Sequence, residues 1–469
     1  MISFSAFDII IILAFFITLL FIGFISSKKT SSDSTDYLLS GRKVGLFLFV
    51  LINVSTWYGG IIGVGEFTYR YGLVSWFTQG FPYYFFAFLF ALFLAKKIRA
   101  ASLFTIPDKL NEVYGKKVAL ISALIVFILV SPAPYLLMVA NLISLIFNIP
   151  ILLSLIIGII LSGSYLLKGG FRSNVYADAY QFFVMFIGFV IIVVVCFISF
   201  GGIGYLQNHL PTNHLKITGD ASPTFLIVWF LIALWTFADP GFHQRSYAAK
   251  SGSVAQKGIL ISIIFWAFFD FLTTSTGLYS KAVLPNLDQP ILAFPLLAER
   301  ILSSGWKGVF YAAMLATIIS TLNSFLFLSA TTISRDFIFR INKYSKDINL
   351  KKYTVWGIVI SGLLSIVIAY FIPSVVEIWY TIGSMFIPGI ILSVISAYYE
   401  KFRVSKEIII IEMSGAVILS IIWFLIRSNF INSVIGEVEP MLVGLTFAIL
   451  THFVGLFRKS FLFDKRKNY

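Results

Sequence analysis

The sequence predicts an all-α protein that crosses a membrane many times. Of its 469 residues, 59% are hydrophobic and only 12% are charged, and the mean hydropathy is +0.93. Soluble domains are closer to half apolar and a quarter charged. Apolar runs of roughly 20 residues, enough helix to cross a hydrocarbon core of about 30 Å, recur along the whole chain. The weak alternation of a membrane β-barrel is missing, so a helical bundle is the fold that satisfies the backbone.

About thirteen apolar runs define the expected transmembrane helices. Because several runs exceed the length that a membrane requires, we expect tilted or broken helices among them. The runs lie near residues 6–26, 43–68, 73–95, 117–145, 150–167, 176–200, 223–243, 256–283, 305–333, 352–373, 376–397, 407–426 and 440–457.

The net charge of +14 would suit a nucleic-acid-binding protein, but the placement of the charges argues for a topology signal instead. If the N-terminus is outside, most lysines and arginines fall in segments on the cytoplasmic side. The basic residues left for the outer side are Arg70, Lys216, Lys281, Arg300, Lys307 and Arg427. This asymmetry follows the positive-inside rule. We therefore expect a multi-pass protein of the plasma (inner) membrane with its C-terminus in the cytoplasm and no nucleic-acid partner.

The first apolar run is expected to be a retained span. It lacks a basic segment before it and a cleavage site after it, and Lys28 and Lys29 follow it instead. The single cysteine, Cys196, lies in an apolar run, so we expect neither a disulfide within the chain nor redox chemistry.

Two of the expected spans are interrupted by glycine or proline. The second contains SerThrTrpTyrGlyGly (55–60), and the seventh ends in PheAlaAspProGlyPhe (237–242). Interrupted spans at matching positions of two halves indicate an inverted repeat with a binding site at the breaks. Gly59 and Gly60 indicate unwound chain, whose freed carbonyls can bind a cation. Close helix packing through Gly59 and Gly63 explains the same glycines equally well.

The ninth span carries a stripe of hydroxyls. Thr317, Ser320, Thr321 and Ser324 have the spacing of one helix face, and Asn323 lies beside them. A single Ser or Thr in such a helix usually bonds the carbonyl four residues earlier. Four on one face favour a site for a hard monovalent cation such as sodium, because neutral oxygens bind it without burying a formal charge. We predict that this stripe faces the broken second span.

Two acids lie within or near apolar sequence. Asp178, at the expected cytoplasmic start of the sixth span, either serves the exit of the ion or caps a helix N-terminus. Asp270, in the eighth span, either pairs with a cationic or amino-bearing solute or, the interpretation that we favour, accepts hydrogen bonds from Thr273 or Thr274.

Several motifs occur in an order that resembles a known family. They are GlyArgLysValGly (41–45), SerThrTrpTyrGlyGly (55–60), TyrArgTyrGly (69–72), AspAlaTyrGln (178–181), GlnArgSerTyrAlaAlaLys (244–250) and AlaThrIleIleSerThrLeuAsnSer followed by SerArgAsp (316–336). Together they resemble the sodium:solute symporter family, which includes sodium/galactose, sodium/proline and sodium/sialic acid carriers. The resemblance covers nearly the whole chain. It implies the LeuT-type fold, with ten core helices in two inverted five-helix repeats, one extra span before them and two after.

On this resemblance the chain divides into five parts. They are an extra span and first cytoplasmic loop (1–42), the first repeat (43–200), an external loop (201–222), the second repeat (223–397), and two extra spans with a basic cytoplasmic tail (398–469).

The resemblance also implies sodium ligands. The principal site would use backbone carbonyls of Ser55, Tyr58 and Thr317 and the hydroxyls of Ser320 and Thr321. Some family members bind a second sodium at positions matching Asp178, Ser320, Asn323 and Ser324. Asn323 stands where those members have serine, which puts the second ion in doubt, although an amide oxygen can still coordinate.

Positions that line the solute pocket in the family fall on Trp57, Gly60, Ile62, Gln79, Ile232 and Trp235. Trp235 matches an aromatic that forms an inner gate in a galactose carrier. Ile62 and Ile232 replace polar sugar-binding residues, so a sugar is disfavoured, and Gln79 remains as a hydrogen-bonding anchor. For Trp57 and Trp235, ordinary helix packing is the competing interpretation.

The resemblance therefore implies sodium-coupled import of a small organic solute by alternating access, without an organic cofactor. The expected partners are the solute, sodium and the lipid bilayer, and a monomer is compatible with the sequence. A proton-coupled carrier, with Asp178 as the titrating group, is the nearest alternative. A solute-sensing receptor is less favoured because only about twelve residues follow the last span, and no cluster of catalytic residues indicates an enzyme.

Overall fold

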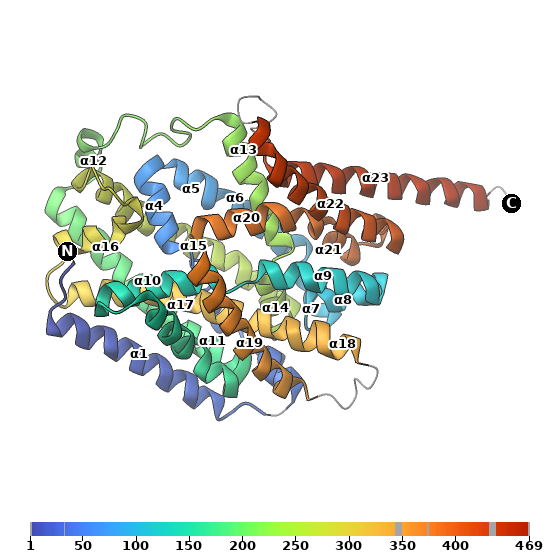
Figure 1. Cartoon of the computed structure of the whole chain (residues 1–469), viewed down its shortest axis with the longest axis horizontal. Coiled ribbons are helices and arrows are strands. Elements are labelled where there is room, and N and C mark those ends of the chain that lie inside the picture. The colour runs from blue at the N-terminus through green and yellow to red at the C-terminus, as the bar shows by residue number, and fades with distance from the viewer. Residues whose placement is uncertain (1, 32, 343–348, 373–374, 431–437, 468–469) are drawn as a thin grey trace.

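The computed structural model describes residues 2–31, 33–342, 349–372, 375–430 and 438–467. Over these residues the chain is helical, apart from loops and one isolated β-bridge between Val44 and Ala249. Many of the longer helices run roughly along the long axis of the molecule, and the two termini lie at its opposite ends (Figure 1). Residue 373, the last of one expected span, and Lys343 and Lys346, two expected cytoplasmic cations, lie outside the described residues.

The helices of the first half are α1 (Ala6–Ser27), α2 (Ser34–Leu39), α3 (Leu46–Ser55), α4 (Ile61–Tyr71), α5 (Val74–Gln79), α6 (Phe81–Phe93), α7 (Ala95–Ala101), α8 (Ile106–Tyr114), α9 (Lys116–Leu129), α10 (Ala133–Phe147), α11 (Ile151–Phe200) and α12 (Ile203–His209). Those of the second half are α13 (Pro223–Ile232), η2 (Ala233–Phe237), α14 (Pro240–Ala248), α15 (Gly252–Val283), α16 (Ala293–Ile301), α17 (Trp306–Thr331), the π-helical segment η4 (Thr332–Ile338), α18 (Phe339–Ile341), α19 (Leu350–Phe371), α20 (Val375–Phe386), η6 (Ile387–Gly389), α21 (Ile391–Tyr398), α22 (Lys406–Ile426) and α23 (Pro440–Lys467).

Within the described residues, 10 helices are long and apolar enough to cross a membrane, or 11 if the bent pair Val74–Phe93 and Ala95–Ala101 forms one span. The expected number of thirteen is therefore not confirmed. Two expected spans, 150–167 and 176–200, belong to the 50-residue helix α11, which departs from helical geometry at Gly170. The second expected span consists of two short helices, α3 and α4, that do not reach the required length separately.

The break in α11 is built around glycine. Gly170 has φ +55°, in the left-handed region that glycine adopts without steric cost. A Cβ atom there would lie 2.4 Å from the carbonyl oxygen of Tyr37. The Tyr37 hydroxyl donates to the carbonyls of Leu166 and Leu167 at 3.0 and 3.2 Å, and so satisfies acceptors that the break releases from the helix.

A charged contact holds α2 against the same break. Arg172 donates to the carboxylate of Asp36, and the backbone amide of Ser31 donates to it at 2.7 Å. Burial on its own raises the pKa of Asp36, but these hydrogen bonds and the charge of Arg172 outweigh it, so the pKa of Asp36 lies below its usual value.

Among the described residues the chain leaves the helix inside four of the expected spans, in addition to the 50° bend between α6 and α7. Two of the interruptions were predicted: the chain leaves the helix between α3 and α4, and between η2 and α14. At the second, Asp239 caps α14 by accepting the amide of Phe242 at 2.9 Å, because the first amides of a helix have no partner within it. The other two, between α9 and α10 and between α20 and α21, were not predicted, although proline marks each of them.

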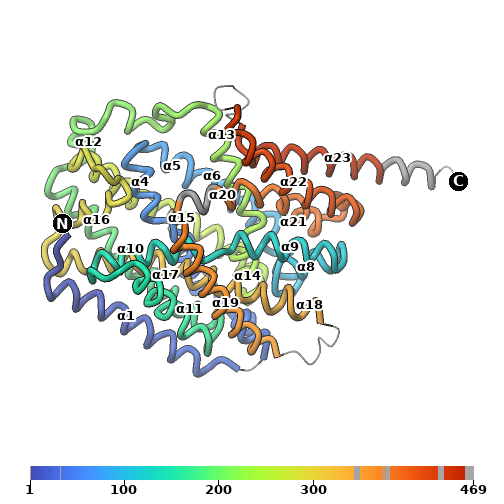
Figure 2. Tube along the Cα trace, in the orientation of Figure 1, coloured from blue at the N-terminus to red at the C-terminus, as the bar shows by residue number. Residues whose placement is uncertain are grey.

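Helix α17 runs through the interior of the bundle. In an apolar stretch of 18 residues of this helix 94% of the residues are buried, whereas 33% are buried in the corresponding stretch of α1. Figure 2 traces α17 beside α10 and α11, and it packs against α1, α10, α11 and α19. The polar side chains of α17 therefore face protein and not lipid, which is the condition for a polar site inside a membrane protein.

Candidate functional site

The hydroxyl stripe of α17 contacts the break between α3 and α4, as predicted. The Ser320 hydroxyl lies 2.6 Å from the carbonyl oxygen of Ser55 and 3.0 Å from that of Thr317. The Thr321 hydroxyl donates to the carbonyl of Thr56 at 3.0 Å. The carbonyls of Ser55 and Thr56 are accessible because α3 ends at Ser55, so the last carbonyls of that helix accept no hydrogen bond from a helical amide.

Gly59 allows this contact. A Cβ atom at Gly59 would lie 2.5 to 2.6 Å from the Cβ, Cγ2 and Oγ1 atoms of Thr321. The two interpretations of the glycines are therefore compatible, since the chain is unwound at the point where it packs most closely against α17.

The other two predicted ligands, Thr317 and Tyr58, also have protein partners. The Thr317 hydroxyl bonds the carbonyl of Ala313 at 2.7 Å, the ordinary back-bond of a helical threonine, while its own carbonyl faces Ser320. The Tyr58 carbonyl accepts the amide of Ile61 at 3.0 Å. A carbonyl oxygen has a second lone pair, so this bond leaves the Tyr58 carbonyl able to accept another interaction.

Asp178 lies beside the stripe, 1% exposed, in the interior of α11. It is not a helix cap, because the helix resumes after the break at Gly170 and continues to Phe200, so Asp178 lies beyond its first turn, and this corrects the capping interpretation. Asn174 links it to α17 by donating to its Oδ2 at 3.0 Å and to the Ser324 hydroxyl at 2.9 Å.

Four oxygens on α3, α11 and α17 are buried without a hydrogen-bond partner among the described residues. They are Asp178 Oδ1, Asn174 Oδ1, Asn323 Oδ1 and Ser55 Oγ. The amide nitrogen of Asn323 donates to the Tyr165 hydroxyl, which leaves its oxygen as the group without a partner. Buried oxygens without donors are unusual in proteins, and a set of them is the environment that a hard cation requires.

Arg245 is the residue that sequence analysis missed, because it was assigned to a cytoplasmic segment. It lies on α14, is only 7% exposed, and donates to the hydroxyls of Thr56 and, at 3.4 Å, Ser324. It also interacts electrostatically with Asp178 and Asp239. The position of Arg245 shortly after the interrupted seventh span was the sequence signal that could have placed it near the site.

A cavity of about 360 Å³ lies where the four spans are interrupted. Its lining includes Thr56 and Thr321, so it adjoins the proposed ion ligands. Five of the six predicted solute positions line it: Trp57, Gly60, Gln79, Ile232 and Trp235. The sixth, Ile62, does not, and it is buried in the apolar core, while the neighbouring Gly63 and Val64 face the cavity.

Trp57 both lines the cavity and packs in an aromatic cluster. Its ring lies 5.0 Å from that of Tyr83, 5.1 Å from that of Trp266 and 5.5 Å from that of Phe242. The packing interpretation of Trp57 is thus correct, and the cluster also holds the indole at the cavity wall.

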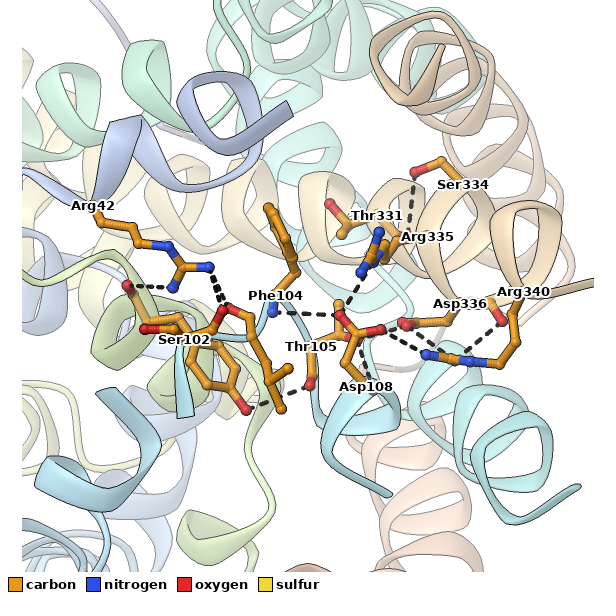
Figure 3. Close-up of polar contacts among 12 residues, drawn as sticks. Arg42, Ser102, Phe104, Thr105, Asp108, Thr331, Ser334, Arg335, Asp336 and Arg340 are labelled. Carbon is orange, nitrogen blue, oxygen red and sulfur yellow. Dashed lines mark hydrogen bonds and ion pairs between the residues drawn. The ribbon is translucent and has the colours of Figure 1, made fainter. Parts of the chain in front are cut away.

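A charged network lies at the predicted cytoplasmic end of α17 (Figure 3). Asp108 of α8 accepts from Arg335 at 3.1 Å and from Arg340 at 2.7 Å. Thr105 donates to Asp336 at 2.6 Å. The network joins Thr105 and α8, which follow the third span, to η4 and α18.

Comparisons with known proteins agree on one family. A model of the sodium:solute symporter family matches residues 37–404. The sodium/pantothenate symporter of Escherichia coli (strain K12) is 25% identical over 371 residues, which are 75% of this chain and 76% of that protein. The sodium/proline symporter of Staphylococcus aureus (strain JH9) is 24% identical over 485 residues, 96% of this chain and 93% of that protein.

Solved structures support the same fold. A substrate-bound, outward-open Na⁺-coupled sialic acid symporter matches with a TM-score of 0.78 at 18% identity, over 96% of this chain and 98% of that one. Mhp1, a nucleobase-cation-symport-1 family transporter, matches with a TM-score of 0.54 at 13% identity, over 91% and 95%. The likeness confirms the LeuT-type fold that the sequence predicts.

Proposed function

Because this chain belongs to the sodium:solute symporter family and imports a small solute with sodium, we propose that the coupling ion binds between α17 and the break that separates α3 from α4. The proposed ligands are the carbonyls of Ser55, Tyr58 and Thr317 and the hydroxyls of Ser320 and Thr321. The observation that supports this site is the direct contact of Ser320 with the Ser55 carbonyl at 2.6 Å. A cation there is held by neutral oxygens alone, which suits a single positive charge.

A second ion is proposed at Asp178, Ser320, Asn323 and Ser324. The unpartnered oxygens of Asp178 and Asn323 support it. Arg245 opposes it, since its guanidinium donates to Ser324 and carries a positive charge beside Asp178. A second sodium would therefore have to share these ligands with Arg245, which makes this site weaker than the principal one.

The position of the cavity supports a direction of solute movement through the protein. Residues of the predicted outer helices α4 and α5 line the cavity, and polar side chains contact one another at the predicted cytoplasmic end. Among these contacts are the Asp108 network and the hydrogen bond between the hydroxyls of Tyr247 and Tyr398 at 2.7 Å. We propose that the solute enters from the outer side and leaves when these contacts open.

Coupling requires that sodium and solute each raise the affinity for the other by the same factor. The ion and the solute are close enough for this, since Thr321 belongs to both the proposed ion site and the cavity wall. The membrane potential then contributes about 2.3 kcal/mol per charge per 100 mV to uptake.

The relatives do not identify the solute of this chain, because their names specify two solutes, pantothenate and proline, that differ in charge. Membership of a sodium-coupled family does not favour the proton-coupled or receptor alternatives.

The sodium site can be tested without knowing the solute. The melting temperature of the purified protein in NaCl is compared with that in KCl at equal ionic strength. We expect sodium to raise it, because a ligand that binds only the folded state stabilises that state. Equal melting temperatures in the two salts would contradict the proposed function.

A further inference from the structure

The cavity beside the helix breaks carries charge of one sign. Of the described residues that line it, two are acidic, Asp239 and Asp270, and none is Lys, Arg or His. A cavity with such a lining attracts positive charge and disfavours a free anion.

The charge of Asp239 is already compensated. Its carboxylate caps α14 by accepting the Phe242 amide at 2.9 Å. It also interacts with Arg245, and a Cβ atom at Gly241 would lie within 2.9 Å of both groups. The negative charge available to a ligand is therefore that of Asp270.

Asp270 lies on α15 and is 8% exposed. Tyr84 donates to its Oδ2, but Thr273 donates to its backbone carbonyl at 3.2 Å and not to its carboxylate. The favoured interpretation, that threonines hold this carboxylate, is thus wrong for Thr273, and no hydrogen bond from Thr274 to it is seen. Among the described residues, no basic side chain forms an ion pair with Asp270. A buried carboxylate without a counter-charge is costly, and the hydroxyls of Tyr84 and Tyr58, which both interact with Asp270, supply hydrogen bonds but no positive charge.

The cavity wall that contains this carboxylate is also rich in aromatic rings. The wall includes Trp57, Trp76, Tyr83 and Trp235. At Gly80 a Cβ atom would lie 2.8 Å from Asp270 Oδ2 and 3.0 Å from Cδ1 of Trp76, so the acid and an indole ring both lie beside Gly80. An acid next to aromatic faces is the environment that recognises an organic cation, through an ion pair and through cation–π attraction.

We infer that the transported solute carries a positively charged nitrogen, as in an amine, a quaternary ammonium or a zwitterion, and that this nitrogen binds Asp270. The inference rests on the proposed function, since it takes the cavity as the solute site. It excludes solutes that are only anionic and neutral sugars.

The test is a thermal-shift panel on the full-length protein in NaCl, built from matched pairs. Choline is paired with its uncharged analogue 3,3-dimethyl-1-butanol, and proline with cyclopentanecarboxylate; gluconate and galactose complete the panel. We expect a nitrogen-bearing compound to raise the melting temperature and its partner without nitrogen to have no effect. A shift caused by gluconate, galactose or either nitrogen-free analogue, or the absence of a shift with both nitrogen compounds, would overturn the inference.

Variants then locate the charge. We expect Asp270→Asn to weaken binding of the active compound about 30-fold or more, because truncating one partner of a buried charge pair has an effect of that size. Tyr84→Phe, which keeps the charge, should weaken it less than about 5-fold, and Asp288→Asn on the outer loop should have no effect. If Tyr84→Phe and Asp270→Asn weaken binding equally, Asp270 only anchors Tyr84 and the inference is wrong.

The sodium-dependent rise in melting temperature distinguishes a failure of the inference about the solute from a failure of the proposed sodium site. If that rise persists in the wild type and in Asp270→Asn while the panel fails, only the nature of the solute is wrong. If the wild type shows no rise, the proposed sodium site fails as well.

Discussion

Ser320 and Ser329 lie on the same helix but face different neighbours. Ser320 contacts the Ser55 carbonyl at the break, whereas the Ser329 hydroxyl meets that of Ser361 on α19 at 2.8 Å. Both side chains are buried, so they differ in what they contact and not in exposure. This makes them a matched pair for separating ion binding from helix packing.

We expect Ser320→Ala to weaken sodium affinity at least tenfold, because it removes one oxygen ligand from a proposed site that has few of them. Ser329→Ala should cost about 1 kcal/mol of stability, the usual value of one hydrogen bond, and leave sodium affinity unchanged. Sodium titrations followed by melting temperature measure both effects. Equal losses of sodium affinity would show that the stripe serves packing alone.

Among the elements, α8 and the segment after α17 are joined by Asp108. This acid accepts from Arg335 and Arg340, and its side chain is only 8% exposed. Removing a buried acid of this kind destabilises a protein more than removing one partner of a surface pair. The surface pair on the same helix is that of Lys109 and Glu112, where Glu112 is 54% exposed. We infer that release of the solute to the cytoplasm requires this contact to break.

We expect Asp108→Asn to loosen the closed end by about 3 kcal/mol, because two guanidinium groups lose their shared partner. Hydrogen–deuterium exchange should increase in α8 (Ile106–Tyr114) and in η4 (Thr332–Ile338). Glu112→Gln is the matched control and should leave exchange in η4 unchanged. Unchanged exchange in Asp108→Asn would show that the network does not hold this end closed.

For the whole molecule, the termini lie at opposite ends of the long axis (Figure 1). This arrangement is compatible with an odd number of crossings, and the distribution of lysine and arginine predicts which end is cytoplasmic. The orientation stays a prediction, which reporter fusions can test.

A fusion of green fluorescent protein to the C-terminus tests the orientation. We expect it to fluoresce, since the fusion would fold in the cytoplasm, while alkaline phosphatase at the same position should be inactive. The opposite pattern would reverse the assignment of the cavity and of the Asp108 network to the two sides.

The sequence by itself determined the membrane class, the family, two of the four interrupted spans and the hydroxyl stripe of α17. Hydropathy, charge placement and helical spacing are local properties, so they can be identified from the sequence alone. Only the tertiary structure decided that Asp178 lies inside a helix, that Arg245 is buried beside it and that Tyr84 contacts Asp270. Each of these facts joins residues that are distant in sequence, or depends on whether an apolar surface faces lipid or protein. Hydropathy has the same value in both environments, which is why the sequence could not distinguish them.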